Sequence, residues 1–174
     1  ILWDKKTETI VNNESSQIIR ILNTAFNDLT GNHIDFYPQE KRTEIDRLND
    51  MIYNNVNNGV YKSGFALTQS AYDDAVTKLF ETLDYLDEQL SHSKFLVGDD
   101  ITEADLRLIP TLLRFDAVYV THFKCNLSRI VDYKNLHRYM QDMLEVPAIK
   151  DTCNIDHIKR CLLYTSDAAD EHTG

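Results

Sequence analysis

The sequence predicts a mainly α-helical fold, in which a short β-hairpin and one helix precede an all-helical bundle. Three observations support this class. Apolar residues recur at helical spacing over most of the chain. Only five glycines and three prolines interrupt 174 residues, and so few turn formers favour helices over many short strands. Strand-like segments are confined to the first dozen residues.

The first thirty residues predict a hairpin followed by a helix. Ile1–Asp4 and Thr9–Val11 are short apolar segments joined by a turn over Lys5–Glu8, and Trp3 is expected in the core. Two strands alone are marginal in water, so we expect further strands upstream of the present first residue. Apolar residues at helical spacing then predict a helix over Ser15–Phe26.

The remaining chain predicts a succession of helices. Ile45, Leu48, Ile52 and Val56 mark one face of a helix that is expected to stop at Asn57–Gly59, a run suited to left-handed conformations. The next segment, 60–66, has no clean period and is either a helical continuation or a loop. Further helices are expected over 70–90, 102–119, 135–144 and 156–159, with a linker over 27–37, an extended connector over 95–99 and Pro147 between the last two helices.

Composition excludes several classes of function. The formal net charge of −10 argues against nucleic acid as a partner, and no stretch approaches the roughly 20 apolar residues needed to span a membrane. Cys125, Cys153 and Cys161 are odd in number and form no C-x-x-C pair. The six histidines show no metal-ligand spacing, so neither a disulfide scaffold nor a metal site is expected. A reducing, cytosol-like compartment is the default.

Two short motifs mark helix starts. Thr102 and Asp105 have the spacing of a capping box, in which hydroxyl and carboxylate accept backbone N–H groups, and we interpret this pair as structural. Glu14 and Ser15 precede an apolar run, where plain helix capping is one interpretation. The other is a site for a zwitterionic amino acid, because the carboxylate can pair with an ammonium group while the hydroxyl and helix-start donors take a carboxylate.

Several strings, taken together and in order, resemble the glutathionyl-hydroquinone reductases, also called xi-class glutathione transferases. The match covers about residues 1–160 and is carried by six segments: Leu2–Lys5, Ile10–Ser15, Asn57–Tyr61, Arg114–Tyr119, His122–Asn126 and Asn154–Lys159. Ordinary transferases share the capping box but not these strings.

The resemblance implies a domain organisation. Residues 1–30 would be the C-terminal piece of a thioredoxin-like, glutathione-binding domain, and residues 31–160 the helical transferase C-terminal domain. Residues 161–174 resemble a translated sequencing adapter and are expected to be a non-native tail, the alternative being a natural acidic tail. Relatives continue with a further active-site tyrosine where this chain has Cys161–Leu163, and Tyr164 is not its substitute.

The resemblance also implies a reaction. A cysteine thiolate removes glutathione from a glutathionyl-hydroquinone, and a second glutathione resolves the mixed disulfide. Family members carry this thiolate in an upstream Cys-Pro-Trp-Ala segment that these 174 residues lack, so the chain alone is expected to be inactive. Glutathione is the expected co-substrate, with no metal, and family members are cytoplasmic homodimers.

The family pattern also assigns roles to residues of this chain. Glu14 and Ser15 hold the γ-glutamyl end of glutathione, Tyr61 exchanges a proton with the substrate, and Tyr119 supports the thiolate. For both tyrosines, simple packing between helices is the alternative, and Cys125 lies in a non-catalytic string. Two other functions remain open: an omega-like thioltransferase acting on dehydroascorbate, and a non-catalytic transferase-like interaction module.

Overall fold

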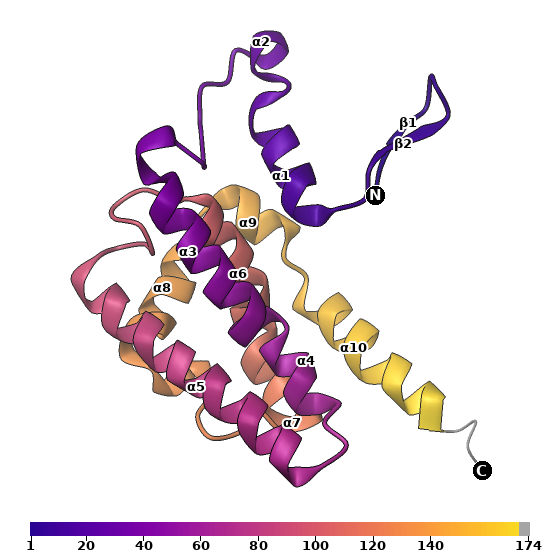
Figure 1. Ribbon diagram of the computed structural model, residues 1–174, viewed down its shortest axis with the longest axis vertical. Coiled ribbons are helices and arrows are strands. Elements are labelled where there is room, and N and C mark those ends of the chain that lie inside the picture. The colour runs from indigo at the N-terminus through magenta and orange to yellow at the C-terminus, as the bar shows by residue number, and fades with distance from the viewer. Residues whose placement is uncertain (171–174) are drawn as a thin grey trace. The chain divides into compact units, whose positions relative to one another are not determined.

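A computed structural model describes residues 1–170 of the chain. The fold is mainly α-helical with one two-stranded sheet at its start (Figure 1), which confirms the predicted fold class. Contacts divide the chain into two compact units, Ile1–Thr43 and the part from Glu44 onward. Within the described residues, no helix combines the length and apolar character that crossing a bilayer requires.

The first unit begins with the expected hairpin. Strand β1 (Leu2–Asp4) pairs antiparallel with β2 (Thr9–Asn12), and Trp3 lies opposite Ile10. The carboxylate of Asp4 accepts the Lys6 N–H at 2.7 Å and orders the turn. Trp3 is 51% exposed, so its expected core position is wrong. A two-stranded sheet offers too little surface to bury an indole.

Two helices follow in this unit. Helix α1 (Ser15–Thr24) agrees with the prediction, whereas the expected linker contains the one-turn helix α2 (Asn27–Thr30). Gly31 ends α2 in the left-handed region, with φ 66°, a conformation that glycine adopts without steric cost. The 3₁₀ turn η1 (Gln39–Lys41) comes last.

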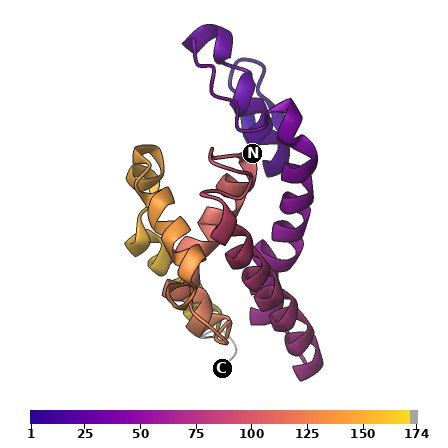
Figure 2. The same ribbon diagram turned by 90° about the vertical axis from the view of Figure 1, so that its left-hand side faces the viewer.

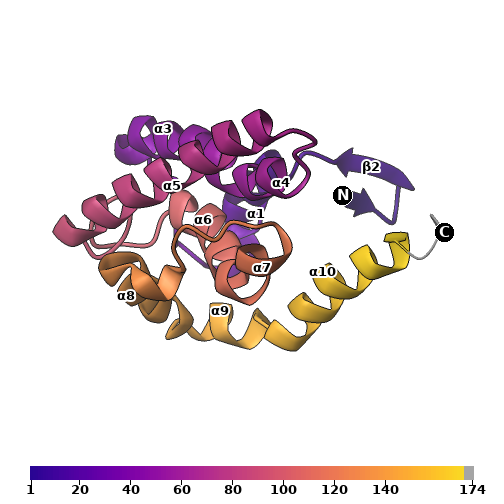
Figure 3. The same cartoon turned by 90° about the horizontal axis from the view of Figure 1, so that it is seen from below.

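The second unit is all-helical. Its elements in chain order are α3 (Arg42–Ile52), the π-helix η2 (Tyr53–Asn57), α4 (Gly59–Gly64), α5 (Gln69–His92), α6 (Glu103–Arg114), the π-helix η3 (Phe115–Tyr119), α7 (Val120–His122), the 3₁₀ turn η4 (Ile130–Asp132), α8 (Lys134–Leu144), α9 (Pro147–Thr152) and α10 (Ile155–Asp170). Helix α6 lies between a layer made by α3, α4 and α5 and a layer that contains α8 (Figures 2 and 3).

The apolar stripes predicted from the sequence form the core of this unit. All four predicted positions of the first stripe, from Ile45 to Val56, are fully buried. On α5 the four leucines from Leu79 to Leu90 are at most 1% exposed. Helix α8 adds Tyr139 and Met143, both fully buried. Because a buried leucine contributes about 1.5–3 kcal/mol, these stripes dominate the stability of the bundle.

The predicted helix stop at Asn57–Gly59 is wrong. Asn58 has right-handed backbone angles, and the chain continues through the π-helix η2 directly into α4. The Asn57 side chain donates to the Arg107 carbonyl at 3.0 Å, so this asparagine bonds to a neighbouring helix and does not form a turn. Segment 60–66, for which helix and loop were both open, is helical as far as Gly64.

The helix expected over 102–119 is irregular at its end. Its α-helical part stops at Arg114, and residues 115–119 form the π-helix η3. At its start, the fully buried Asp105 carboxylate accepts the Thr102 N–H at 2.8 Å and the Thr102 hydroxyl at 2.9 Å. The same carboxylate accepts the Leu96 N–H and the Tyr139 hydroxyl, at 3.0 and 3.1 Å. The cap therefore also joins α6 to α8.

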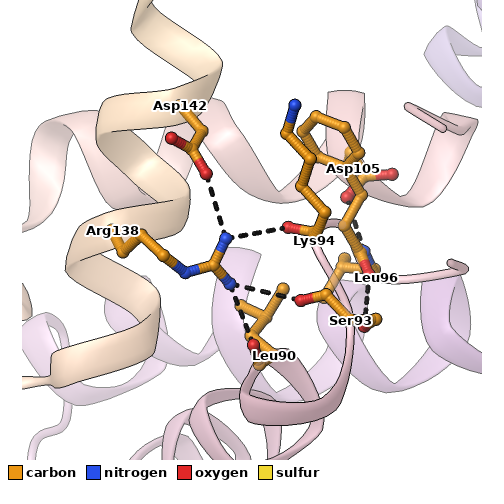
Figure 4. A network of polar contacts seen from close by, with 8 residues as sticks. Leu90, Ser93, Lys94, Leu96, Asp105, Arg138 and Asp142 are labelled. Carbon is orange, nitrogen blue, oxygen red and sulfur yellow. Dashed lines mark hydrogen bonds and ion pairs between the residues drawn. The ribbon is translucent and has the colours of Figure 1, made fainter. Parts of the chain in front are cut away.

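A second junction closes the C-terminal end of α5 (Figure 4). The Arg138 guanidinium donates to the carbonyl of Leu90 at 2.9 Å and to that of Ser93 at 3.2 Å. It also forms an ion pair with Asp142 at 3.0 Å. A cation is favourable at a helix C-terminus, because the last carbonyls lack partners inside the helix and carry a partial negative charge.

Candidate functional site

The structure brings Tyr61 and Tyr119 together although they are 58 positions apart in the sequence. Their hydroxyl oxygens are 3.4 Å apart, and their rings meet edge to face with centroids 5.9 Å apart. Tyr61 is on α4, directly after the π-helix η2, and Tyr119 is the last residue of the π-helix η3. Such π-helical turns are rare and occur frequently at functional sites.

The two phenols differ in their access to solvent. Tyr61 is 38% exposed, whereas Tyr119 is 2% exposed. Burial raises the pKa of Tyr119 well above its usual value, and the hydrogen bond with Tyr61 acts in the same direction. Tyr119 is therefore a neutral phenol at physiological pH. The pair consists of one hydroxyl that a substrate can reach and one buried hydroxyl behind it.

Cys125 lies near this pair but is not arranged as a nucleophile. Its side chain is fully buried, and its Sγ is 3.9 Å from the Val60 carbonyl oxygen. Burial raises the pKa of the Cys125 thiol to about 12. A reactive cysteine requires the opposite, a lowered pKa and exposure. Cys153 is partly exposed and Cys161 exposed, and none of the three cysteines forms a disulfide within the described residues.

Glu14 and Ser15 lie in the first unit, at the start of α1. Glu14 is the N-cap residue, and its Oε1 accepts the Ser16 N–H at 3.3 Å and the Ser16 hydroxyl at 3.0 Å. Its own N–H donates to the Asn12 side chain at 2.7 Å. Ser15 is exposed. The carboxylate is thus held in place by the helix start while its other oxygen, Oε2, makes no bond within the described residues.

No metal site accompanies these residues. Among residues 1–170, no group of three or more His, Cys, Asp or Glu side chains is arranged to hold a metal ion.

The sequence did not single out the aromatic residues that surround the tyrosine pair. Phe123 stacks on Tyr119 with an interplanar angle of 8°, and its centroid is 5.1 Å from that of Tyr61 and 5.3 Å from that of Phe65. The spacing of Phe115, Tyr119 and Phe123 at i, i+4 and i+8 is the signal that could have identified one helical face.

Comparisons with known proteins agree with this fold. Residues 69–142 match the family described as glutathione S-transferase, C-terminal domain. The chain is 54% identical over 159 residues to the glutathionyl-hydroquinone reductase YqjG of Escherichia coli, covering 91% of the chain and 48% of that protein. It is 55% identical to the glutathionyl-hydroquinone reductase PcpF of Sphingobium chlorophenolicum, covering 91% of the chain and 51% of that relative.

Solved structures give the same result. The glutathione-bound structure of Escherichia coli YqjG superposes with a TM-score of 0.90 at 53% identity, over 92% of this chain and 52% of that one. The glutathione-S-transferase Xi from Phanerochaete chrysosporium gives a TM-score of 0.89 at 57% identity, over the same shares. The chain spans about half the length of the curated relatives it matches.

The helical bundle, with its buried cap at Asp105, thus contains a glutathione-transferase C-terminal domain. Within that class, the chain is a homologue of the glutathionyl-hydroquinone reductases, which confirms the resemblance found in the sequence.

Proposed function

We propose that this chain is part of an enzyme that uses glutathione to reduce glutathionyl-hydroquinones to hydroquinones. The names of the relatives that match at 54–55% identity support this substrate class. The observation that carries the proposal is the tyrosine pair, in which the half-exposed Tyr61 hydroxyl lies 3.4 Å from the buried Tyr119 hydroxyl. A phenol at the surface backed by a neutral phenol is suited to proton exchange with an aromatic substrate.

The reaction transfers the glutathionyl group to a thiolate. The thiolate attacks the glutathione sulfur, a sulfur–sulfur bond forms, and the bond between sulfur and the aromatic ring breaks. The electron pair of that bond remains on the ring carbon, which takes up a proton, and free hydroquinone leaves. A second glutathione then attacks the mixed disulfide, which yields glutathione disulfide and restores the thiol.

In this scheme Tyr61 gives the proton to the ring carbon. Its phenolate then needs stabilisation, and the Tyr119 hydroxyl can donate a hydrogen bond to it across the 3.4 Å separation. The high pKa of Tyr119 keeps that donor protonated. We also propose for Tyr119 the role that the family pattern assigns to it, support of the catalytic thiolate.

Glutathione would be held at Glu14 and Ser15. The Oε2 atom of Glu14 is proposed to pair with the γ-glutamyl ammonium, while the Ser15 hydroxyl and the N–H groups at the start of α1 take the adjacent carboxylate. This role is compatible with the observed cap, because the bonds from Ser16 both go to Oε1.

The nucleophile is proposed to come from outside these 174 residues. Cys125 is buried with a raised pKa, and neither Cys153 nor Cys161 lies in a family string that carries the thiolate. The chain alone should therefore show no turnover of a glutathionyl-hydroquinone in the presence of glutathione. Turnover by the chain alone would overturn this part of the proposal.

The role of Tyr61 is tested in a longer polypeptide that also carries the nucleophile. Tyr61→Phe should lower kcat on the order of 100-fold or more, because it removes the proton donor. Tyr53→Phe is the matched control, since Tyr53 is 56% exposed and lies on the neighbouring η2. An unchanged kcat in Tyr61→Phe would contradict the assignment.

One finding favours a second candidate. The chain is 47% identical over 167 residues to a protein of Schizosaccharomyces pombe named glutathione S-transferase omega-like 2, and omega-type activity would mean thiol transfer to dehydroascorbate. Comparing kcat/KM for a glutathionyl-hydroquinone and for dehydroascorbate decides between them. A higher value for dehydroascorbate would replace the leading proposal.

We further propose that the enzyme acts as a homodimer in the cytoplasm, as the family pattern implies. Light scattering coupled to size exclusion tests the oligomeric state, and a monomer at micromolar concentration would contradict it.

A further inference from the structure

Phe123 is the residue on which the aromatic rings around the proposed site converge. Its ring stacks on Tyr119 with centroids 5.3 Å apart, and it also packs against Tyr61 and Phe65, at 5.1 and 5.3 Å. Phe123 is 4% exposed, so it fills the interior side of the cluster. The two tyrosines that share a hydrogen bond therefore also share one packing partner.

Gly64 forms the other side of the Phe123 binding surface. A Cβ atom added at Gly64 would lie 2.5 Å from both Cγ and Cδ1 of the Phe123 ring and 2.8 Å from its Cβ. These separations are far below the 3.5–4.0 Å at which carbon atoms attract each other. The ring thus rests directly on the backbone of α4, three residues after Tyr61.

The backbone around Phe123 is fixed from a second direction. The following residue, Lys124, has a left-handed conformation with φ 58°, which is uncommon outside glycine. The Tyr72 hydroxyl on α5 donates to the Lys124 carbonyl at 2.7 Å, and the Cys125 N–H donates to the Tyr119 carbonyl at 3.0 Å. The ring cannot yield easily by moving its own backbone.

We propose that Gly64 and Phe123 are positioning residues that set the distance between the Tyr61 and Tyr119 hydroxyls. The ring of Phe123, held against the bare backbone at Gly64, fixes the plane of the Tyr119 ring and the side of the Tyr61 ring. At 3.4 Å the hydroxyl pair is already at the long end of hydrogen-bond distances. A shift of a few tenths of an ångström in Phe123 is therefore enough to separate the hydroxyls.

The relevance of this geometry to catalysis rests on the proposed function, but the geometry itself can be tested without it. Tyrosine is labelled with ¹³C at Cζ in the 174-residue chain, and the two resonances are assigned with Tyr61→Phe and Tyr119→Phe. Gly64→Ala should shift both resonances and leave that of the fully buried Tyr139 in place. Gly59→Ala is the matched control in the same helix, because its Cβ would meet Leu79 at an ordinary 3.7 Å.

A double mutant separates the contact from a general loss of stability. In a Phe123→Leu background, adding Gly64→Ala should cause no further shift of the Tyr61 and Tyr119 resonances, because the ring that the new methyl group displaces is gone. Phe123→Tyr, which keeps the ring, should restore both to their wild-type positions. Unchanged resonances in a folded Gly64→Ala variant would overturn the proposal.

If Gly64→Ala does not fold, Phe123→Leu is compared with Phe80→Leu. Phe80 is 6% exposed and contacts Phe115. Equal shifts of the tyrosine pair in both variants would overturn the proposal, whereas a shift in Phe123→Leu alone supports it.

The catalytic arm uses the longer polypeptide with its nucleophile. Gly64→Ala should lower kcat by about 10- to 100-fold, as misplacement of reacting groups does, with the KM for glutathione unchanged. Wild-type kcat despite shifted resonances would overturn the positioning role. If the wild-type polypeptide does not turn over glutathionyl-hydroquinones while the resonances shift as expected, the proposed function fails and the contact stands.

Discussion

The carboxylate of Asp87 accepts the backbone N–H of Leu136 at 2.7 Å, so the start of α8 is capped by a residue of α5. The same oxygen accepts the Asn135 N–H at 2.8 Å. A helix start leaves its first N–H groups without partners inside the helix. Here a separate helix satisfies two of them, which ties the folding of α8 to that of α5.

Asp87→Ala should lower the free energy of unfolding by about 1–2 kcal/mol, the usual cost of losing an N-cap. Asp87→Asn should cost less, because the amide oxygen can still accept both N–H groups. Urea unfolding followed by circular dichroism measures the change. Glu81→Ala, an exposed position on the same helix, should stay within about 0.5 kcal/mol of the wild type. An equal effect at both sites would contradict the cap.

Arg138→Ala should destabilise the chain by about 1–2 kcal/mol, because it removes bonds to the Leu90 and Ser93 carbonyls at the end of α5. The side chain is 39% exposed, which limits the effect. Arg129→Ala is the control, since the side chains of its ion pair with Asp132 are 58% and 48% exposed and such pairs contribute little. Amide hydrogen exchange should show faster exchange near residue 92 in Arg138→Ala only.

Asp105→Asn should destabilise the chain by about 1–3 kcal/mol. Each carboxylate oxygen accepts a backbone N–H, from Leu96 or from Thr102, and an amide has only one oxygen. One buried N–H would therefore face the new NH₂ group and lose its acceptor. Thermal and urea unfolding measure the loss. Asp99→Asn, in the exposed connector before α6, should be nearly neutral, and a neutral Asp105→Asn would contradict the inferred network.

Cys125 predicts a loss of stability in alkali. Its pKa is raised to about 12 in the folded chain, against about 8.5 for an unfolded cysteine. Above pH 9 the unfolded chain loses this proton while the folded chain keeps it, so the stability falls as pH rises, by about 1.4 kcal/mol per pH unit. Below the unfolded pKa the contribution is fully present.

Urea unfolding of the wild type and of Cys125→Ala at pH 8 and pH 10.5 tests this dependence. Only the pH-dependent difference is compared, which removes the cost of the deleted sulfur at neutral pH and, to first order, the titration of the tyrosines. The wild type should lose more stability over this interval than the variant. Parallel losses would show that the Cys125 thiol ionises in the folded chain.

Periodicity predicted most of the fold, because a buried stripe at helical spacing has few other solutions. It predicted the four buried leucines of α5 and the buried face that includes Ile45. It did not predict the helical path through Asn58, where local preference favours a stop. That preference is overridden by burial of Val60 and by the bond from Asn57 to Arg107.

The candidate site was predictable only in part. The family strings pointed to Tyr61 and Tyr119, but no spacing could show that two residues 58 positions apart share a hydrogen bond. Gly64 was missed for a related reason. Its importance arises from the ring of Phe123, which approaches its backbone from a distant part of the sequence.

The two π-helices also govern how this region can accommodate changes in length. Each contains an i→i+5 bond, from the Asn58 N–H to the Tyr53 carbonyl and from the Val120 N–H to the Phe115 carbonyl, and so accommodates one residue more than an α-helical turn. Deleting one residue there would restore regular α-helix and rotate the next helical segment by about 100°. Tyr61 would then turn away from Tyr119. Within η2 and η3, the number of residues therefore matters as much as their identity, and single-residue deletions that a surface loop tolerates would separate the phenols.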